Sequence, residues 1–279
     1  MDSVKFNHIL GHKLDNMAKI DGKTVWVTGA SSGIGEALVY ALDKKNCKLI
    51  ISSRKKEALE RVKSNCIHKE NIAIVPMDLA DITAMPEKAK QAFEVFGSIA
   101  ILINNAGISQ RSEIAKTDIS VYKKLMDINY LGTVALSKSV LPYFIKNSSG
   151  HFVTVSSLMG KFAGPQRSGY CGAKHALHGF FDVLRMEHES DGIDVTMICP
   201  GYVQTNIDKN ALTADGSPQR THDAENQNGL PVDVFAKKMI RAIERKKYEA
   251  YMGGKEVMGV YVKRLFPRLF HRLVLRSTK

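Results

Sequence analysis

The sequence predicts an α/β protein with a doubly wound, mainly parallel, seven-stranded sheet and helices on both faces. Short β-branched runs alternate with helical patterns from residue 23 to residue 252. The first run ends in a glycine-rich turn that leads into a helical pattern. Polar and glycine residues recur where the predicted strands end, and parallel sheets of this kind bind ligands at those ends.

The elements follow one another without a long gap before residue 204. Because strands separated by helices require right-handed crossovers, they form a parallel sheet that is covered on both faces. The predicted strands are residues 23–28, 47–52, 72–75, 100–103, 151–155, 194–198 and 249–252. The predicted helices are residues 34–44, 57–65, 84–96, 117–146, 168–189 and 232–246. The polar stretch 204–229 has no clear period, which is typical of a functional lid or a disordered loop.

Length and composition fit one large globular domain, with 279 residues of which 44% are hydrophobic. We divide the chain into a leader or added extension (1–20), a single catalytic domain (21–254) and a basic amphipathic C-terminal extension (255–279). Four cysteines without metal-ligand spacing indicate reduced thiols, no metal site and a cytoplasmic protein. No early apolar run resembles a signal peptide.

The net charge of +12 raises the possibility of nucleic-acid binding. Half of this excess lies in the C-terminal extension, where seven Lys and Arg residues accompany one acid, Glu256. No nucleic-acid-binding motif accompanies these charges. We therefore predict no nucleic-acid partner.

Two stretches carry the chemistry. Glycines in the turn from Gly29 to Gly35 allow close backbone approach, and the helix that follows presents free N–H groups to a phosphate. Tyr170 and Lys174 are four residues apart on a predicted helix, so their side chains share one face. An ammonium beside a phenol lowers the pKa of the phenol, which can then exchange a proton with an alcohol or ketone oxygen. Ser157 could donate a hydrogen bond to that oxygen.

Six motifs in order make the chain resemble the short-chain dehydrogenase/reductase family, whose single-domain members have a Rossmann-type fold. They are the glycine turn from Thr28, Asn104–Gly107 (NNAG), Asn129, Ser157, Tyr170 with Lys174, and Pro200–Gly201. The resemblance covers residues 23–252 and is nearest to the hydroxysteroid-dehydrogenase-like and dehydrogenase/reductase member 7-like group. Residues 155–161 and 200–215 carry that narrower resemblance.

The resemblance implies a role for each catalytic residue. Tyr170 would be the general acid/base, Lys174 would lower its pKa and bind the nicotinamide ribose, and Ser157 would polarise the substrate carbonyl. Asn129, at a helix distortion, would hold a water that links Lys174 to solvent. The implied cofactor-binding residues are Gly29, Ser31, Ser32, Gly33, Ile34, Gly35, Arg54, Lys55, Asp78, Leu79, Asn104, Asn105, Ala106, Gly107, Tyr170, Lys174, Pro200, Gly201, Val203 and Thr205.

Charge at the end of the second strand indicates the cofactor. An acid there would accept from a ribose 2′-OH and repel a 2′-phosphate, but this sequence has Arg54 and Lys55 instead. Arg54 can hold a phosphate bidentately, which predicts NADP(H).

The resulting hypothesis is an NADP-dependent oxidoreductase, such as a carbonyl reductase, acting on an apolar steroid-like or lipid-like ketone or alcohol. Ser157, Leu158, Met159, Phe162 and Tyr202 are the predicted substrate residues. Two alternatives remain open: a 3-oxoacyl thioester reductase and a catalytically silent NADP-binding scaffold. The family implies a homodimer or homotetramer formed through the helices that hold Asn129 and Tyr170.

The C-terminal extension mixes apolar and basic residues, and Pro267 predicts two short helices in place of one. We favour packing beside the substrate cleft or on a partner subunit. The alternative is peripheral contact of residues 256–279 with an anionic membrane.

Overall fold

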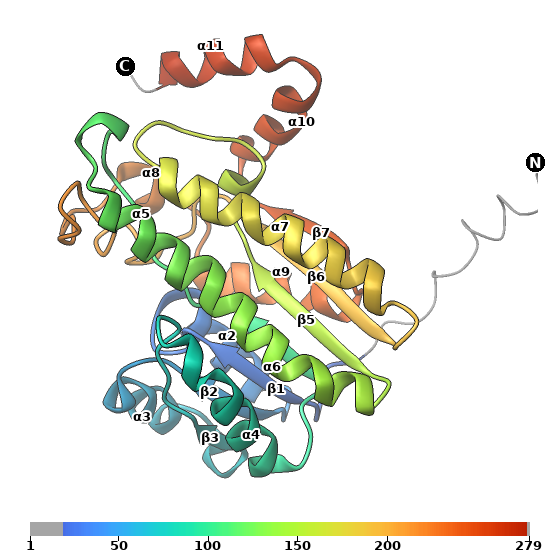
Figure 1. Ribbon diagram of the computed structural model, residues 1–279. Helices are drawn as coiled ribbons and strands as arrows, with labels where there is room; N and C mark the ends of the chain where they lie inside the picture. The colour runs from blue at the N-terminus through green and yellow to red at the C-terminus, as the bar shows by residue number, and fades with distance from the viewer. Residues whose placement is uncertain (1–18, 278–279) are drawn as a thin grey trace, which may run out of the picture.

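The computed structural model describes residues 19–277, which form a seven-stranded parallel sheet covered by helices on both faces (Figure 1). The strand order is β3-β2-β1-β4-β5-β6-β7, and each neighbouring pair is parallel. The order reverses between β1 and β4, where open sheets of this kind bind ligands. The predicted fold class is confirmed. Most of the predicted leader, residues 1–18, lies outside the described residues.

The element bounds lie within a few residues of those predicted. The strands are β1 Thr24–Thr28, β2 Lys48–Ser52, β3 Ile72–Ile74, β4 Ile101–Asn104, β5 Gly150–Val155, β6 Ile193–Pro200 and β7 Glu249–Met252. The α-helices are α2 Gly33–Asp43, α3 Lys56–Ser64, α4 Met85–Phe96, α5 Ile119–Met126, α6 Gly132–Lys146, α7 Ser168–His188, α8 Ala224–Gln227, α9 Val232–Glu244, α10 Met258–Leu265 and α11 Pro267–Ser277.

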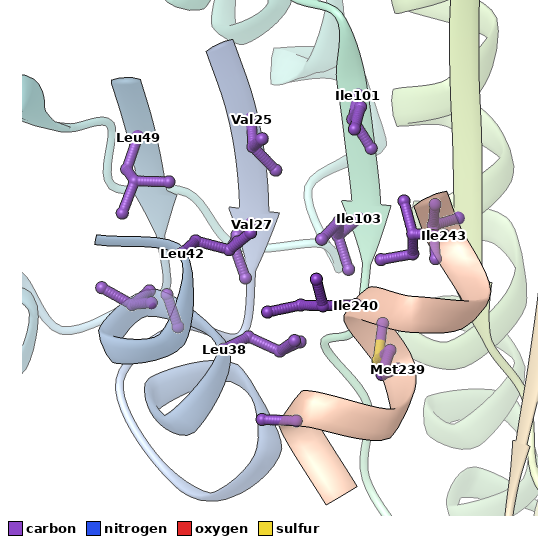
Figure 2. Close-up of a cluster of buried hydrophobic side chains, with 14 of the residues drawn as sticks. Val25, Val27, Leu38, Leu42, Leu49, Ile101, Ile103, Met239, Ile240 and Ile243 are labelled. Carbon is purple, nitrogen blue, oxygen red and sulfur yellow. The ribbon is translucent and has the colours of Figure 1, made fainter. Parts of the chain in front are cut away.

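Two apolar clusters lie on opposite faces of the sheet, because side chains alternate along each buried strand. In β1, Val25 and Val27 point toward α2 and α9, where they join Leu38 and Ile240 (Figure 2). Trp26 points the other way, into the cluster formed with α4, α6 and α7, and is fully buried as predicted. The core therefore fixes β1, and with it the turn that follows, from both sides.

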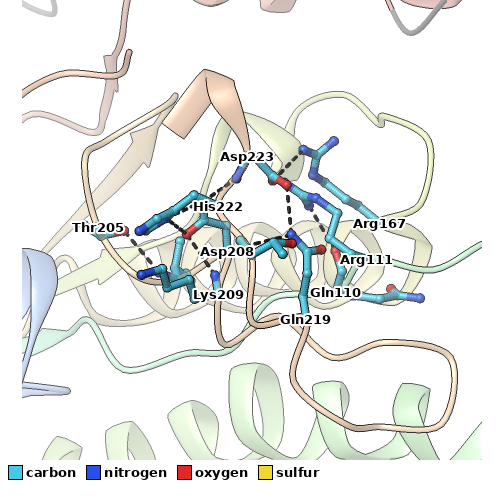
Figure 3. Close-up of polar contacts among 11 residues, drawn as sticks. Gln110, Arg111, Arg167, Thr205, Asp208, Lys209, Gln219, His222 and Asp223 are labelled. Atoms are coloured by element: carbon cyan, nitrogen blue, oxygen red, sulfur yellow. Dashed lines mark hydrogen bonds and ion pairs between the residues drawn. The ribbon is translucent and has the colours of Figure 1, made fainter. Parts of the chain in front are cut away.

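Two stretches of the chain have a more detailed structure than the sequence periodicity alone predicts. The helical region predicted over residues 117–146 is interrupted by a π-helical turn at Asp127–Leu131, between α5 and α6. The stretch 204–229 is held by polar contacts: the buried Asp208 accepts hydrogen bonds from the backbone N–H groups of Lys209 and Asp223 and contacts His222 (Figure 3). This loop packs against the site and contains the short helix α8.

The C-terminal extension forms two helices, α10 and α11, separated at Pro267 as predicted. They lie at one end of the molecule, beyond the layers of the sheet (Figure 1). Within residues 19–277, none of the helices has both the length and the apolar character needed to cross a bilayer.

Gly35 provides a test of how tightly the first turn is packed. A Cβ at Gly35 would lie 2.1 Å from the carbonyl oxygen of Gly29, so Gly35→Ala must displace the turn. We expect a loss of about 3 kcal/mol or more in unfolding free energy, measured by urea denaturation. The matched control is Gly179→Ala in α7, where no atom lies within 4 Å of the added Cβ. It should stabilise the protein by up to about 1 kcal/mol; equal effects of the two variants would contradict this account.

Candidate active site

A cleft of about 510 Å³ lies at the carboxyl ends of the strands and brings most of the predicted site residues together. Its lining contains three of the four predicted catalytic residues: Ser157, Tyr170 and Lys174. The predicted cofactor residues that line it are Gly29, Ser31, Ser32, Gly33, Ile34, Arg54, Lys55, Asp78, Leu79, Asn105, Ala106, Gly107, Tyr170, Lys174, Pro200, Gly201, Val203 and Thr205. A larger depression of about 1090 Å³ between α2 and α9 contains none of the predicted catalytic residues.

Several predicted site residues lie outside this lining. Gly35 packs against the backbone of Gly29. Asn104 is buried and donates hydrogen bonds to Ser137 and Thr154, at 3.0 and 3.4 Å, which joins β4 to α6 and β5. The predicted substrate residues Leu158, Met159, Phe162 and Tyr202 also lie outside the lining. Leu158 and Phe162 are buried in a small cluster with Cys199, against which α10 and α11 pack.

The glycine turn is held against the end of β4. Gly29 has a φ of 64°, and a Cβ there would lie 2.8 Å from the Cα of Ala106, so only glycine fits without displacement. The side-chain amide of Asn105 donates to the carbonyl oxygens of Thr28 and Gly29 at 2.9 and 3.3 Å. The Thr28 hydroxyl accepts from the N–H groups of Asn105 and Ala106. Thr28 was part of the motif but not a predicted site residue.

The cleft fits a dinucleotide. The glycine turn lines the cleft, and no hydrogen bond from the Ser32 side chain caps the start of α2 after it. The free backbone N–H groups at this helix start favour the binding of a pyrophosphate. Arg54 and Lys55 follow β2 at the cleft wall, and both are exposed. Among the described residues neither forms an ion pair, so their charges face the cleft without a protein counter-ion. Asp78 follows β3, the strand next to β2, and accepts a hydrogen bond from the N–H of Ala80 at 3.0 Å.

Tyr170 and Lys174 lie one turn apart on α7, and both are buried. The Lys174 ammonium lies 5.8 Å from the centre of the Tyr170 ring and donates to the carbonyl oxygen of Val155 at 2.8 Å. Burial raises the pKa of Tyr170, and a hydrogen bond with Ser157 opposes that rise. Burial lowers the pKa of Lys174 to about 8. The prediction that Lys174 lowers the Tyr170 pKa is therefore wrong for this structure: burial raises that pKa, and the charges that oppose the rise are those of Arg167 and Arg111.

The two serines that follow β5 have different partners. The Ser157 hydroxyl accepts from the N–H of Met159 at 3.1 Å and donates to the carbonyl oxygen of Pro200 at 3.4 Å. The Ser156 hydroxyl donates instead to the backbone carbonyl of Lys174 at 3.2 Å. Ser156 therefore fastens α7 to the sheet, while Ser157 lies beside the Tyr170 hydroxyl.

Asn129 lies in the π-helical turn, which is the helix distortion predicted at this residue. π turns are common at functional sites. The Asn129 side chain accepts from the N–H of Ile108 at 2.8 Å and donates to its carbonyl oxygen at 2.9 Å. A Cβ on Gly107 would lie 3.0 Å from the Asn129 oxygen and 3.5 Å from the Lys174 nitrogen. Asn129 and Lys174 are therefore neighbours across Gly107.

No sequence pattern indicated the residues that fix the start of α7. The Gln110 side-chain oxygen accepts from the N–H groups of Gly169 and Tyr170, at 2.7 and 3.3 Å, and so caps the helix at the tyrosine. Next to it, Arg111 and Arg167 share the carboxylate of Asp223, which joins the loop 204–229 to this helix end (Figure 3). No sequence pattern identifies a loop glutamine as the cap of a helix that begins almost sixty residues later.

Apolar side chains surround Tyr170. Val121, Leu125 and Leu212 form a buried cluster with its ring, and Ile108 and Met159 pack against them. Ile108 and Leu212 also line the cleft. If the carbonyl of a substrate reached the Tyr170 hydroxyl, the apolar groups of that substrate would therefore lie between apolar side chains.

The buried ammonium of Lys174 predicts a pH-dependent stability. Its pKa of about 8 lies below the ordinary value of 10.5, so between these pH values the folded chain loses a proton that the unfolded chain keeps. The contribution of Lys174 to the unfolding free energy therefore rises with pH between about 8 and 10.5. The unfolding free energy of wild type minus that of Lys174→Met should grow by about 2 to 3 kcal/mol from pH 7 to pH 10. The exposed Lys146, changed to Met, is the control; a constant difference for Lys174→Met would contradict the buried charge.

Comparison with known proteins agrees with the site. The family model for short chain dehydrogenases matches residues 23–216. The chain is 38% identical over 277 residues to Dehydrogenase/reductase SDR family member 7B of Xenopus laevis, covering 96% of this chain and 85% of that protein. It is 48% identical over 197 residues to Dehydrogenase/reductase SDR family member 7 of Homo sapiens, covering 68% of this chain and 58% of that protein.

The fold comparison agrees with this. A short-chain dehydrogenase/reductase from Burkholderia phymatum, solved in complex with NAD, superimposes with a TM-score of 0.79 at 20% identity, over 90% of this chain and 95% of that one. The chain belongs to the short-chain dehydrogenase/reductase family. Members of this family are nicotinamide-dependent oxidoreductases that act on alcohol and carbonyl groups of small molecules.

Proposed function

We propose that the protein is an NADP(H)-dependent carbonyl reductase or alcohol dehydrogenase for apolar, steroid-like or lipid-like substrates. The observation that carries this proposal is the cleft itself. It joins the glycine turn, the Ser157–Tyr170–Lys174 group, and the charges of Arg54 and Lys55, which form no ion pair among the described residues. The apolar ring of side chains around Tyr170 supports the substrate class.

In the reducing direction, the bound nicotinamide would supply the hydride that the carbonyl carbon receives. The Ser157 hydroxyl would hydrogen-bond the carbonyl oxygen and polarise it. The Tyr170 hydroxyl would give its proton to the same oxygen, which becomes the alcohol. Its raised pKa keeps Tyr170 protonated at neutral pH, as the reducing direction requires. Lys174 would return a proton to Tyr170 from solvent, through a water that Asn129, its neighbour across Gly107, would hold.

The test is NADPH oxidation by the purified protein against a panel of apolar ketones, aldehydes and 3-oxoacyl thioesters. We expect turnover with apolar ketones. Turnover confined to the thioesters would support the alternative 3-oxoacyl reductase. Tight NADPH binding without turnover of any panel member would favour the scaffold alternative.

A further inference from the structure

We propose that the outer face of α10 and α11 binds the surface of an anionic lipid bilayer. The inference concerns a surface outside the cleft and does not depend on the proposed reaction. By the outer face we mean the exposed apolar residues Leu265, Phe266, Leu269 and Leu273 together with the basic residues Arg264, Arg268, Arg272 and Arg276.

The apolar stripe of α11 is only partly covered by the body of the protein. Phe270 faces the body, where its ring packs against Phe162 at 5.1 Å between centroids. Leu269 and Leu273 flank Phe270 on the same stripe and are 49% and 47% exposed. A helix that needed only to pack beside the cleft would not require leucines at the exposed edge of the stripe. The predicted packing therefore leaves part of the apolar stripe uncovered.

The exposed apolar surface continues beyond α11. At the end of α10 and the junction that follows it, Leu265 and Phe266 are 68% and 61% exposed. Contiguous exposed apolar residues with charged neighbours mark interaction sites on soluble proteins.

The charges of the outer face identify the partner. Arg268, Arg272 and Arg276 follow at intervals of four, a spacing that places like charges next to one another and destabilises an isolated helix. The sequence has no acid after Glu256, and within the described residues none of these arginines forms an ion pair. The face therefore lacks a counter-charge and fits an anionic partner.

A lipid surface satisfies both kinds of side chain at once. Headgroup phosphates and carboxylates pair with the arginines, while the adjacent leucines enter the acyl boundary. A second copy of the chain would bring the same positive charge, and a nucleic acid would give the leucines no apolar medium.

The outer face is joined to the cleft wall through Glu256. One of its carboxylate oxygens accepts from the N–H groups of Tyr202 and Gly254, at 3.2 and 3.0 Å. A Cβ on Gly201 would lie 2.2 Å from that oxygen, so the carboxylate is packed against the residues that follow β6. The extension is thus held in a fixed place beside the cleft, and a bilayer on its outer face would lie near the cleft entrance.

The test is co-sedimentation of the full chain with vesicles of phosphatidylcholine containing about 30% phosphatidylserine, at low salt and at about 0.5 M salt. We expect binding at low salt, loss at high salt, and little binding to pure phosphatidylcholine. The variant Arg268→Gln/Arg272→Gln/Arg276→Gln should bind about 100-fold more weakly. Leu269→Gln/Leu273→Gln should also bind at least about tenfold more weakly.

The matched control is Lys69→Gln/Lys90→Gln/Lys146→Gln, which removes the same charge from exposed positions elsewhere and should bind as wild type does. Absence of binding at low salt, or equal losses in the arginine variant and the control, would overturn the proposal. Self-association that Leu269→Gln/Leu273→Gln abolishes, without vesicle binding, would also overturn it in favour of a second copy. Thermal unfolding of each variant confirms that it is folded.

Discussion

Replacing Tyr170 with Phe is expected to reduce kcat for ketone reduction by about 10³-fold while leaving the Kd for NADPH unchanged. The substitution removes one oxygen, the group proposed to donate the proton, and keeps the ring that packs against Val121, Leu125 and Leu212. The apolar cluster stays filled, so the fold should be retained. Stopped-flow NADPH oxidation and fluorescence titration measure the two quantities.

Tyr122→Phe is the matched control. Its hydroxyl contacts that of Ser168 at 3.0 Å, at the start of the same helix, but it is not part of the cleft lining. This variant should keep its rate within about threefold. If Tyr170→Phe retained most of the wild-type rate, the proton would come from another group and the assignment of Tyr170 would be wrong.

Replacing Arg54 with Asp is expected to raise the Kd for NADPH by about 100-fold and to change the Kd for NADH little. The arginine lies exposed at the cleft wall after β2 without an ion pair among the described residues. The variant loses the charge-assisted hydrogen bonds to a 2′-phosphate and places a like charge beside it. NADH lacks that phosphate. Titration of both cofactors, monitored by fluorescence, gives the ratio.

Lys69→Asp makes the same change of charge at an exposed position outside the cleft. It should leave the preference between the cofactors unchanged, which separates a local contact from a general effect of net charge. Equal weakening of NADPH and NADH by Arg54→Asp would contradict the proposed phosphate contact.

The sheet could be predicted because its determinants are local. The alternation of Val25, Trp26 and Val27 and the glycine turn after β1 depend on short-range sterics and on burial of both faces. The positions of the cleft residues could be predicted as well, because the carboxyl ends of the strands in a parallel sheet lie at the same edge. Pro267 predicted the break between α10 and α11 for the same local reason.

What could not be predicted depends on contacts between distant residues. Gln110 caps the start of α7 across 59 residues of sequence, and no property of residue 110 alone indicates this. The ordering of loop 204–229 depends on Asp208 being buried beside His222. The placement of Leu158 and Phe162 behind the cleft wall depends on the extension that covers them. The pKa of Tyr170 also depends on burial, which the spacing of Tyr170 and Lys174 does not determine.

The most direct test of the proposed function is hydride transfer from NADPH that carries deuterium in place of both hydrogens at C4 of the nicotinamide. The labelled cofactor is incubated with an apolar ketone from the panel, with wild type and Tyr170→Phe in parallel, and the alcohol is examined by mass spectrometry. We predict that wild type places one deuterium on the carbinol carbon and that Tyr170→Phe yields almost no labelled alcohol. If NADPH binds but no panel ketone acquires the label, the proposed carbonyl reduction is contradicted.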